Sequence, residues 1–236
     1  MSAAAAPTRV TIDIWSDVMC PWCLVGYRQL EKALVWLDGE IAAEIRWRPF
    51  ELNPDMPPQG EDQAAHIMRK YGRTAEQAAQ GRTQMREIAA RAGAALSYAG
   101  EEGADAPPAM MWNTFAAHKL LAATLTAHGP DVQTALKLAL FSAHFEHRRN
   151  VSDPAVLVAI AEDVGIPAAE AQAALADETL DVRVRAEEAH AWDMNISGVP
   201  AMVVNGKFLI PGAQEPEVYA STLRRVVERA GLKAEV

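Results

Sequence analysis

The two cysteines of the chain lie two residues apart, in the segment Cys20-Pro21-Trp22-Cys23. Two thiols at this spacing can interconvert between a dithiol and a disulfide, because the second thiol can resolve a mixed disulfide formed on the first. A structural zinc site needs about four ligands, and the sequence contains no second cysteine pair. The motif therefore favours redox chemistry over a zinc site or two inert buried thiols.

The elements on either side of the motif determine which cysteine reacts. Residues 9–15 are rich in β-branched and aromatic side chains and predict a buried strand, whereas residues 24–37 carry leucines at helical spacing. Pro21 suits the first turn of that helix, where no N–H is needed. Cys20 is then expected at the helix N-terminus, where the free N–H groups and the helix dipole favour a thiolate. We expect Cys20 to be the exposed nucleophile and Cys23 the buried resolving thiol.

The rest of the chain predicts one mixed sheet with a long helical insertion. A second strand is expected over residues 44–50 and a proline-containing loop over 52–62. Helices are expected over 64–71, 74–92, 110–128, 132–147, 154–164, 167–176 and 180–193, two strands over 199–204 and 207–210, and a last helix over 217–231. This order is that of an α/β, thioredoxin-like fold with an inserted all-helical domain. Residues 1–62 and 194–236 would form the discontinuous thioredoxin-like domain, and 63–193 the insertion.

Composition excludes several classes of partner. The 236 residues are half apolar and carry a net charge of −9, which argues against nucleic acid or an anionic membrane as the main partner. No apolar run is long enough for a membrane span, and residues 1–7 lack the basic and apolar regions of a secretory signal. With a single cysteine pair, the cytosol is the expected location.

The chain resembles the DsbA family of thioredoxin-fold dithiol–disulfide oxidoreductases, and in particular its FrnE-like cytoplasmic branch. The matching motifs spread over nearly the whole chain. They are DVMCPWC at 17–23, FELNPDM at 50–56, Asn113-Thr114 with Ala117-His118, NVSD at 150–153, GVP at 198–200 and GAQ at 212–214.

The resemblance implies roles for five residues. Cys20 would be the nucleophile and Cys23 the resolving thiol, and Pro200 would follow a cis peptide bond beside the pair. Val199 would then present its backbone N–H and C=O to an extended substrate peptide. Trp22 would either contact the peptide or pack over the redox pair. The best-known periplasmic members have a histidine between the cysteines. Its absence here predicts a higher pKa for Cys20 and a weaker oxidant, suited to reduction or isomerisation.

Two aspartates and a pair of histidines have simpler interpretations than catalysis or metal binding. Asp13 or Asp17 would be placed to assist proton transfer at Cys23, although a cap on the turn into the helix is the simpler role for Asp17. His144 and His147 have no accompanying metal-ligand pattern. We interpret both as core or solvated histidines.

Two further segments leave alternatives open. Met110-Met111, Trp112 and Phe115 would either line a substrate groove facing the redox pair or form a core stripe of the insertion, which is the simpler interpretation. Arg148-Arg149, beside a predicted helix C-terminus, is interpreted as compensation of the helix dipole rather than as an anion site.

The sequence therefore predicts a cytosolic thiol–disulfide oxidoreductase, or a disulfide isomerase, acting on protein or small-molecule disulfides. No metal or organic cofactor is required, and glutathione is the candidate reductant or co-substrate. One alternative is a glutathione-dependent enzyme of the kappa-type transferase and 2-hydroxychromene-2-carboxylate isomerase group, which uses a serine at the position of Cys20. The other is a non-catalytic peptide-binding or chaperone module.

Overall fold

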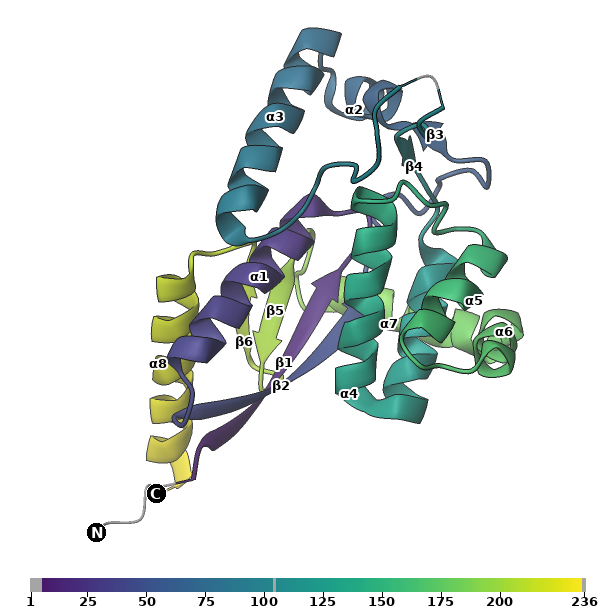
Figure 1. The fold of residues 1–236 in the computed structure, drawn as a ribbon. Coiled ribbons are helices and arrows are strands. Elements are labelled where there is room, and N and C mark those ends of the chain that lie inside the picture. Colours follow the sequence, from purple (N-terminus) through teal and green to yellow (C-terminus); the bar gives the residue numbers. More distant parts are fainter. Residues whose placement is uncertain (1–5, 104, 235–236) are drawn as a thin grey trace.

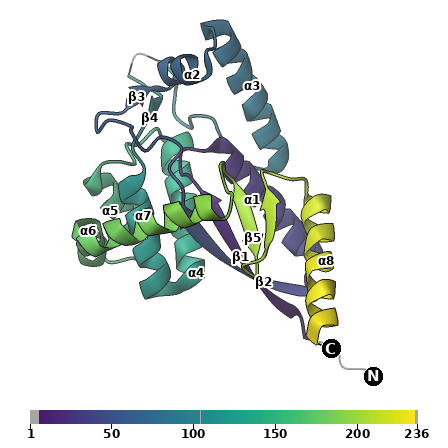
Figure 2. The same ribbon diagram turned by 180° about the vertical axis from the view of Figure 1, so that it is seen from behind.

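The computed structural model describes residues 6–103 and 105–234 (Figures 1 and 2). The prediction that residues 1–7 are no secretory signal falls mostly on positions outside these ranges. At the centre lies one mixed sheet with the strand order β2-β1-β5-β6. β1 pairs in parallel with β2 and antiparallel with β5, and β5 pairs antiparallel with β6. The strands are β1 (Thr8–Ser16), β2 (Ile41–Pro49), β5 (Ala201–Val204) and β6 (Phe208–Pro211).

Helices cover both faces of this sheet. α1 (Pro21–Trp36) and α8 (Pro216–Ala234) pack together on one face, and α7 (Glu178–Asp193) crosses the other, as Figure 2 shows. The alternation of side chains along β1 explains both layers, since Ile12 and Ile14 enter the core under α1 while Trp15 enters a second core with Ala191 of α7.

The inserted segment contributes to the core of the sheet as well as forming its own. α4 (Phe115–Phe145) packs along β2, and α3 (Ala75–Ala92) packs against α1. α2 (Gln63–Tyr71) and α3 stand over the N-terminal end of α1 (Figure 1). α5 (Pro154–Asp163) and α6 (Ala168–Ala176) pack on the far side of α4. A capping box of Thr74 and Gln77 begins α3, as its sequence predicts.

The α/β fold class is confirmed, with two local corrections. The helix expected from residue 110 is wrong at its start, because Met110–Met111 forms a strand, β4, that pairs with Glu61–Asp62, β3. Such a two-residue ribbon depends on long-range pairing and leaves no periodic signal. The break expected at Gly129 is confirmed, because this residue, with a φ of 84°, is not helical and separates two helical stretches that together carry the label α4. The second stretch ends at Phe145 rather than at residue 147. No helix within the described ranges has the length and apolar character needed to cross a membrane.

Candidate active site

The two cysteines lie where β1 gives way to α1. Cys20 is the N-cap of α1 and Pro21 begins its first turn. The Cys20 N–H donates to the carbonyl of Asp17, and the Cys23 N–H donates to the carbonyl of Cys20, both at 3.1 Å. These bonds turn the chain so that the two cysteines, both free thiols, lie 3.3 Å apart. A mixed disulfide on one sulfur would therefore be within reach of the other.

The loop before β5 lies directly opposite Cys20. The Val199–Pro200 peptide bond is cis, as the resemblance implied, and the Cys20 thiol donates to the Val199 carbonyl at an S···O distance of 3.7 Å. At Gly26 of α1, a Cβ atom would lie only 3.1 Å from Pro200 Cγ and 3.3 Å from the Cβ of Ala213. The absence of a side chain at Gly26 thus lets α1 approach this loop closely.

Cys20 is much less exposed than the sequence predicts. Its exposed fraction is 3%, and that of Cys23 is 0%, so the expectation of an exposed Cys20 is wrong. Cys20 nevertheless lines a groove of about 500 Å³, which we call the redox groove. Trp22, Met111 and Val199 also line it, together with side chains from α2 and α3. Trp22, 44% exposed, would meet a molecule that enters the groove.

The two thiols ionise as a pair. Burial opposes ionisation of Cys23, but the Cys20 thiol, the Ser16 hydroxyl and the charge of Lys137 together lower the pKa of Cys23. The hydrogen bond with Cys23 and burial raise the pKa of Cys20. Because the two sulfurs adjoin, the first proton is lost from the pair rather than from either thiol alone. That the helix N-terminus favours the thiolate form of Cys20 stays a prediction.

A buried lysine that the sequence analysis did not single out lies behind the pair. Lys137 is completely buried, its Nζ is 3.4 Å from the Ser16 carbonyl oxygen, and it lies 4.9 Å from the centre of the Phe141 ring. Burial lowers the pKa of Lys137 to about 8, although the negative charges of Cys23 and Asp17 oppose this shift. The charge of Lys137 in turn favours ionisation of Cys23.

A glutamine one turn earlier explains how Lys137 comes to be buried. β2 lies at an edge of the sheet, and the side chain of Gln133 pairs with both backbone groups of Trp47. It accepts the Trp47 N–H at 2.8 Å and donates to the Trp47 carbonyl at 2.9 Å. Gln133, Lys137 and Phe141 follow one another at intervals of four, so they share one helix face. The spacing of Gln133 and Lys137 on one helix face was the only sequence signal for a buried lysine. That this face points to the sheet follows from the pairing of Gln133 with β2.

Of the two aspartates considered for proton transfer, Asp17 lies close to the pair and Asp13 does not. The buried carboxylate of Asp17 accepts the N–H groups of Met19 at 3.2 Å and Leu52 at 2.7 Å. Burial opposes its ionisation, but His118, whose Nε2 lies 3.8 Å away, and the Leu52 N–H lower the pKa of Asp17. The interpretation as a turn cap is confirmed. Asp13 instead forms an ion pair with Arg48 at 2.7 Å.

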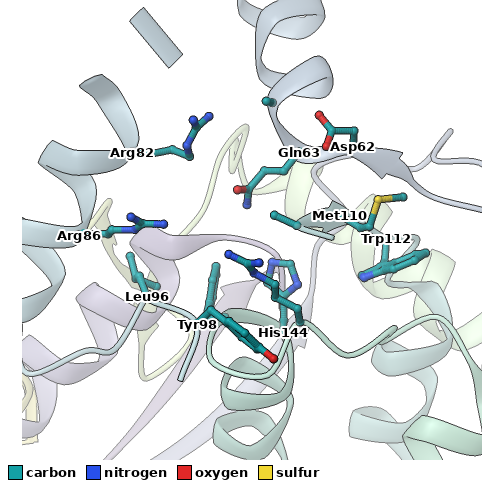
Figure 3. A pocket seen from close by; sticks show the side chains of 13 residues that line it. Asp62, Gln63, Arg82, Arg86, Leu96, Tyr98, Met110, Trp112 and His144 are labelled. Carbon is teal, nitrogen blue, oxygen red and sulfur yellow. The ribbon is translucent and has the colours of Figure 1, made fainter. Parts of the chain in front are cut away.

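The remaining candidates from the sequence divide between two cavities. Met111 lines the redox groove, while Met110, Trp112 and His144 line an adjoining cavity (Figure 3). His144 is a buried histidine, as expected, and burial lowers its pKa to about 4. Phe115 lines neither cavity and packs against Arg185, whose guanidinium lies 4.0 Å from the centre of its ring.

A thioredoxin-like sheet with a reduced cysteine pair at a helix N-terminus and a cis-proline opposite defines a protein of the thioredoxin-fold redox class. The chain belongs to the DsbA-like thioredoxin domain family, whose family model matches residues 11–235. The known members of this family are thiol–disulfide oxidoreductases.

Three comparisons illustrate the relationship. The crystal structure of the probable DsbA oxidoreductase SCO1869 from Streptomyces coelicolor is 32% identical, with a TM-score of 0.78, and the match covers 92% of this chain and 89% of that chain. The uncharacterized protein YwbO of Bacillus subtilis is 26% identical over 91% of this chain and 96% of its own length. The cytosolic disulfide reductase DsbM from Pseudomonas aeruginosa is 17% identical, with a TM-score of 0.61 over 92% and 98% of the two chains, and shares the fold.

Proposed function

We propose that this protein is a cytosolic thiol–disulfide oxidoreductase in which Cys20 is the nucleophile and Cys23 the resolving thiol. One observation carries the proposal: the two thiols lie 3.3 Å apart, and only Cys20 of the pair lines the redox groove. Membership of the DsbA-like family supports this chemistry. The fold shared with DsbM, which is described as a cytosolic disulfide reductase, supports the proposed cytosolic location.

The proposed cycle conserves atoms and electrons. The Cys20 thiolate attacks one sulfur of a substrate disulfide, so that a Cys20–substrate disulfide forms and the other half of the substrate leaves as a thiolate. The Cys23 thiolate then attacks Cys20 Sγ and expels the second half. The substrate has gained two electrons as two thiols, and the protein has lost them as a Cys20–Cys23 disulfide. A small dithiol or two glutathione thiols would return the protein to its reduced state.

The walls of the groove supply the substrate contacts in this proposal. The backbone of Val199, held by Pro200 across from Cys20, would add strand-like hydrogen bonds to an extended peptide. The half-exposed Trp22 ring would pack against the substrate beside the reacting sulfur. The same pair would also isomerise non-native disulfides, because a mixed disulfide on Cys20 can be resolved by a substrate thiol instead of Cys23.

Equilibration against a series of reduced and oxidised glutathione mixtures tests the proposal. Acid quenching and mass spectrometry would count free thiols at each ratio, and the proposal predicts a single reversible transition in which two thiols are lost together. Two thiols that persist at every ratio would contradict it and would favour a non-catalytic binding module. Disulfide-exchange activity should vanish in the Cys20→Ser/Cys23→Ser double variant. If glutathione-dependent activity survives in that variant, the kappa-type alternative is correct.

A further inference from the structure

A second cavity adjoins the redox groove and is lined by arginines. This cavity, which we call the arginine cavity, has a volume of about 260 Å³ and includes Arg82, Arg86 and His144 in its walls. Figure 3 shows Arg82 and Arg86 reaching from α3 into the space, with His144 across from them. Both arginines also line the redox groove, so the two spaces share a wall.

The charge of the redox groove is opposite to that of the protein, whereas the arginine cavity also includes the carboxylate of Asp62, which accepts the Ala65 N–H at the start of α2. The chain has a net charge of −9, yet the redox groove is lined by the cations Lys70, Arg73, Arg82 and Arg86, and no Asp or Glu is among its described lining residues. A concentration of positive charge on an acidic protein raises the local concentration of anions. The groove is therefore electrostatically suited to an acidic substrate.

Several polar groups in the arginine cavity have no partner within the protein. Among the described residues, neither the Arg82 nor the Arg86 guanidinium forms an ion pair or a hydrogen bond. His144 is 5% exposed, and both of its ring nitrogens lack a hydrogen-bond partner in the described part of the chain. Buried polar groups are normally satisfied, so the two ring nitrogens of His144 require an explanation. The half-buried Arg82 and the exposed Arg86 are accessible to a ligand. Arg148, by contrast, already pairs with Glu102.

The sizes of the two spaces indicate which part of a substrate each would hold. Pockets for whole small molecules usually measure about 300–1,000 Å³. The redox groove, at about 500 Å³, falls within that range, whereas the arginine cavity, at about 260 Å³, lies below it. The arginine cavity therefore suits one end of a molecule whose reacting sulfur lies at Cys20.

We propose that the arginine cavity binds a carboxylate end of a small-molecule disulfide or thiol while its sulfur exchanges with Cys20. Arg82 and Arg86 form charge-assisted hydrogen bonds to the carboxylate, as guanidinium groups do, and a His144 ring nitrogen donates to it from the opposite wall. This assignment rests on the proposed function for its substrate class, but the binding site itself can be tested without any redox step.

Binding of S-methylglutathione, which carries carboxylates and has no reactive sulfur, tests the site directly. Isothermal titration calorimetry should show binding to the reduced wild-type protein and at least about tenfold weaker binding to the Arg82→Gln/Arg86→Gln variant. His144→Leu, which removes the ring nitrogens, should also weaken binding several-fold. The matched control Arg91→Gln/Arg225→Gln removes the same net charge from exposed positions outside both cavities and should bind as the wild type does.

The ligand and the reaction each supply a further control. S-methylglutathione with its carboxylates converted to amides should not bind detectably. Equal affinity of the wild type and the arginine variant, or equal affinity for the acid and the amide, would overturn the assignment. Reduction of the uncharged bis(2-hydroxyethyl) disulfide by the wild type and by the Arg91→Gln/Arg225→Gln control tests the proposed function separately from the binding site. A wild type that binds the acid but reduces no disulfide would refute the proposed function and leave the anion site standing.

Discussion

The two sides of the cysteine pair differ in almost every physical respect. On the side of Cys20 lies an open groove with the half-exposed Trp22 at its mouth. On the side of Cys23 lies a closed interior in which Lys137 and Asp17 are completely buried. The groove contains Arg82 and Arg86, whose guanidinium groups have no partner among the described residues, whereas the interior contains charges that compensate one another.

This difference separates two tasks that a redox site must perform. The interior determines how easily a proton leaves the pair, because Lys137 lowers the pKa of Cys23. The groove determines which disulfide reaches Cys20. Changes in the interior should therefore alter the pH dependence of reactivity for every substrate, and changes in the groove should alter the ranking of substrates at any one pH.

The largest effect is expected from Lys137→Met, which keeps the approximate volume and removes the buried charge. The pKa of the pair should rise, because the cation that favours the thiolate is gone. Iodoacetamide alkylation should slow several-fold at pH 7 and recover at higher pH. The exposed control Lys207→Met should leave the pH profile unchanged. An identical profile in both variants would show that Lys137 does not act on the pair.

A change in the groove should instead discriminate between substrates. Trp22→Ala removes the aromatic surface beside Cys20, so reduction of a peptide disulfide should slow several-fold because its contact with the ring is lost. Reduction of bis(2-hydroxyethyl) disulfide, which is too small to use that surface, should change little. Stopped-flow measurements would compare the reduction rates of the two substrates. An equal loss of rate for both would show that Trp22 packs over the cysteine pair rather than contacting the peptide.

Glu51, a buried carboxylate that forms an ion pair with Arg185 of α7, should make the protein less stable as the pH rises. Burial and the charge of Glu188 raise the pKa of Glu51 to about 7, against the opposing effect of Arg185. The folded state binds this proton more tightly than the unfolded chain does. Its stabilising contribution to the free energy of unfolding is therefore fully present below about pH 4.5 and is lost as the pH rises through about 7. Glu51→Gln should therefore raise the free energy of unfolding by about 2 kcal/mol at pH 8 and by little at pH 5. Urea denaturation at the two pH values measures this, and an equal effect at both would refute it.

The smallest effect is expected from a loss of stability in α3, the helix that forms one wall of the redox groove. Thr74→Ala removes the side chain that caps α3, and the free energy of unfolding should fall by about 1 kcal/mol. Thermal denaturation would measure the loss, while reduction of a neutral disulfide should be unaffected. A loss of activity in the folded variant would mean that α3 positions the cysteines as well as the arginines.

The predictability of each feature depends on how local its cause is. The turn that places Cys20 before Pro21 and the capping box at Thr74 are encoded within a few residues, and both are as predicted. The strand at Met110–Met111 exists only through its partner at 61–62, so local periodicity missed it.

The features missed at the site itself have the same origin. The burial of Cys20, the inward direction of Lys137 and the convergence of Arg82 with His144 all depend on how the inserted helices pack on the thioredoxin-like part. From the sequence alone, a lysine or arginine on an amphipathic helix is expected to face solvent. Only the packing shows that these cations face the thiols and the groove.

Trapping of the mixed disulfide tests the central claim most directly. Reduced Cys23→Ser and Cys20→Ser variants would each be mixed with oxidised glutathione, quenched with acid and analysed by peptide mass spectrometry. The account predicts a stable glutathione adduct on Cys20 in the first variant and none on Cys23 in the second, because only Cys20 lines the redox groove. An adduct on Cys23 in the second variant, with none on Cys20 in the first, would contradict it.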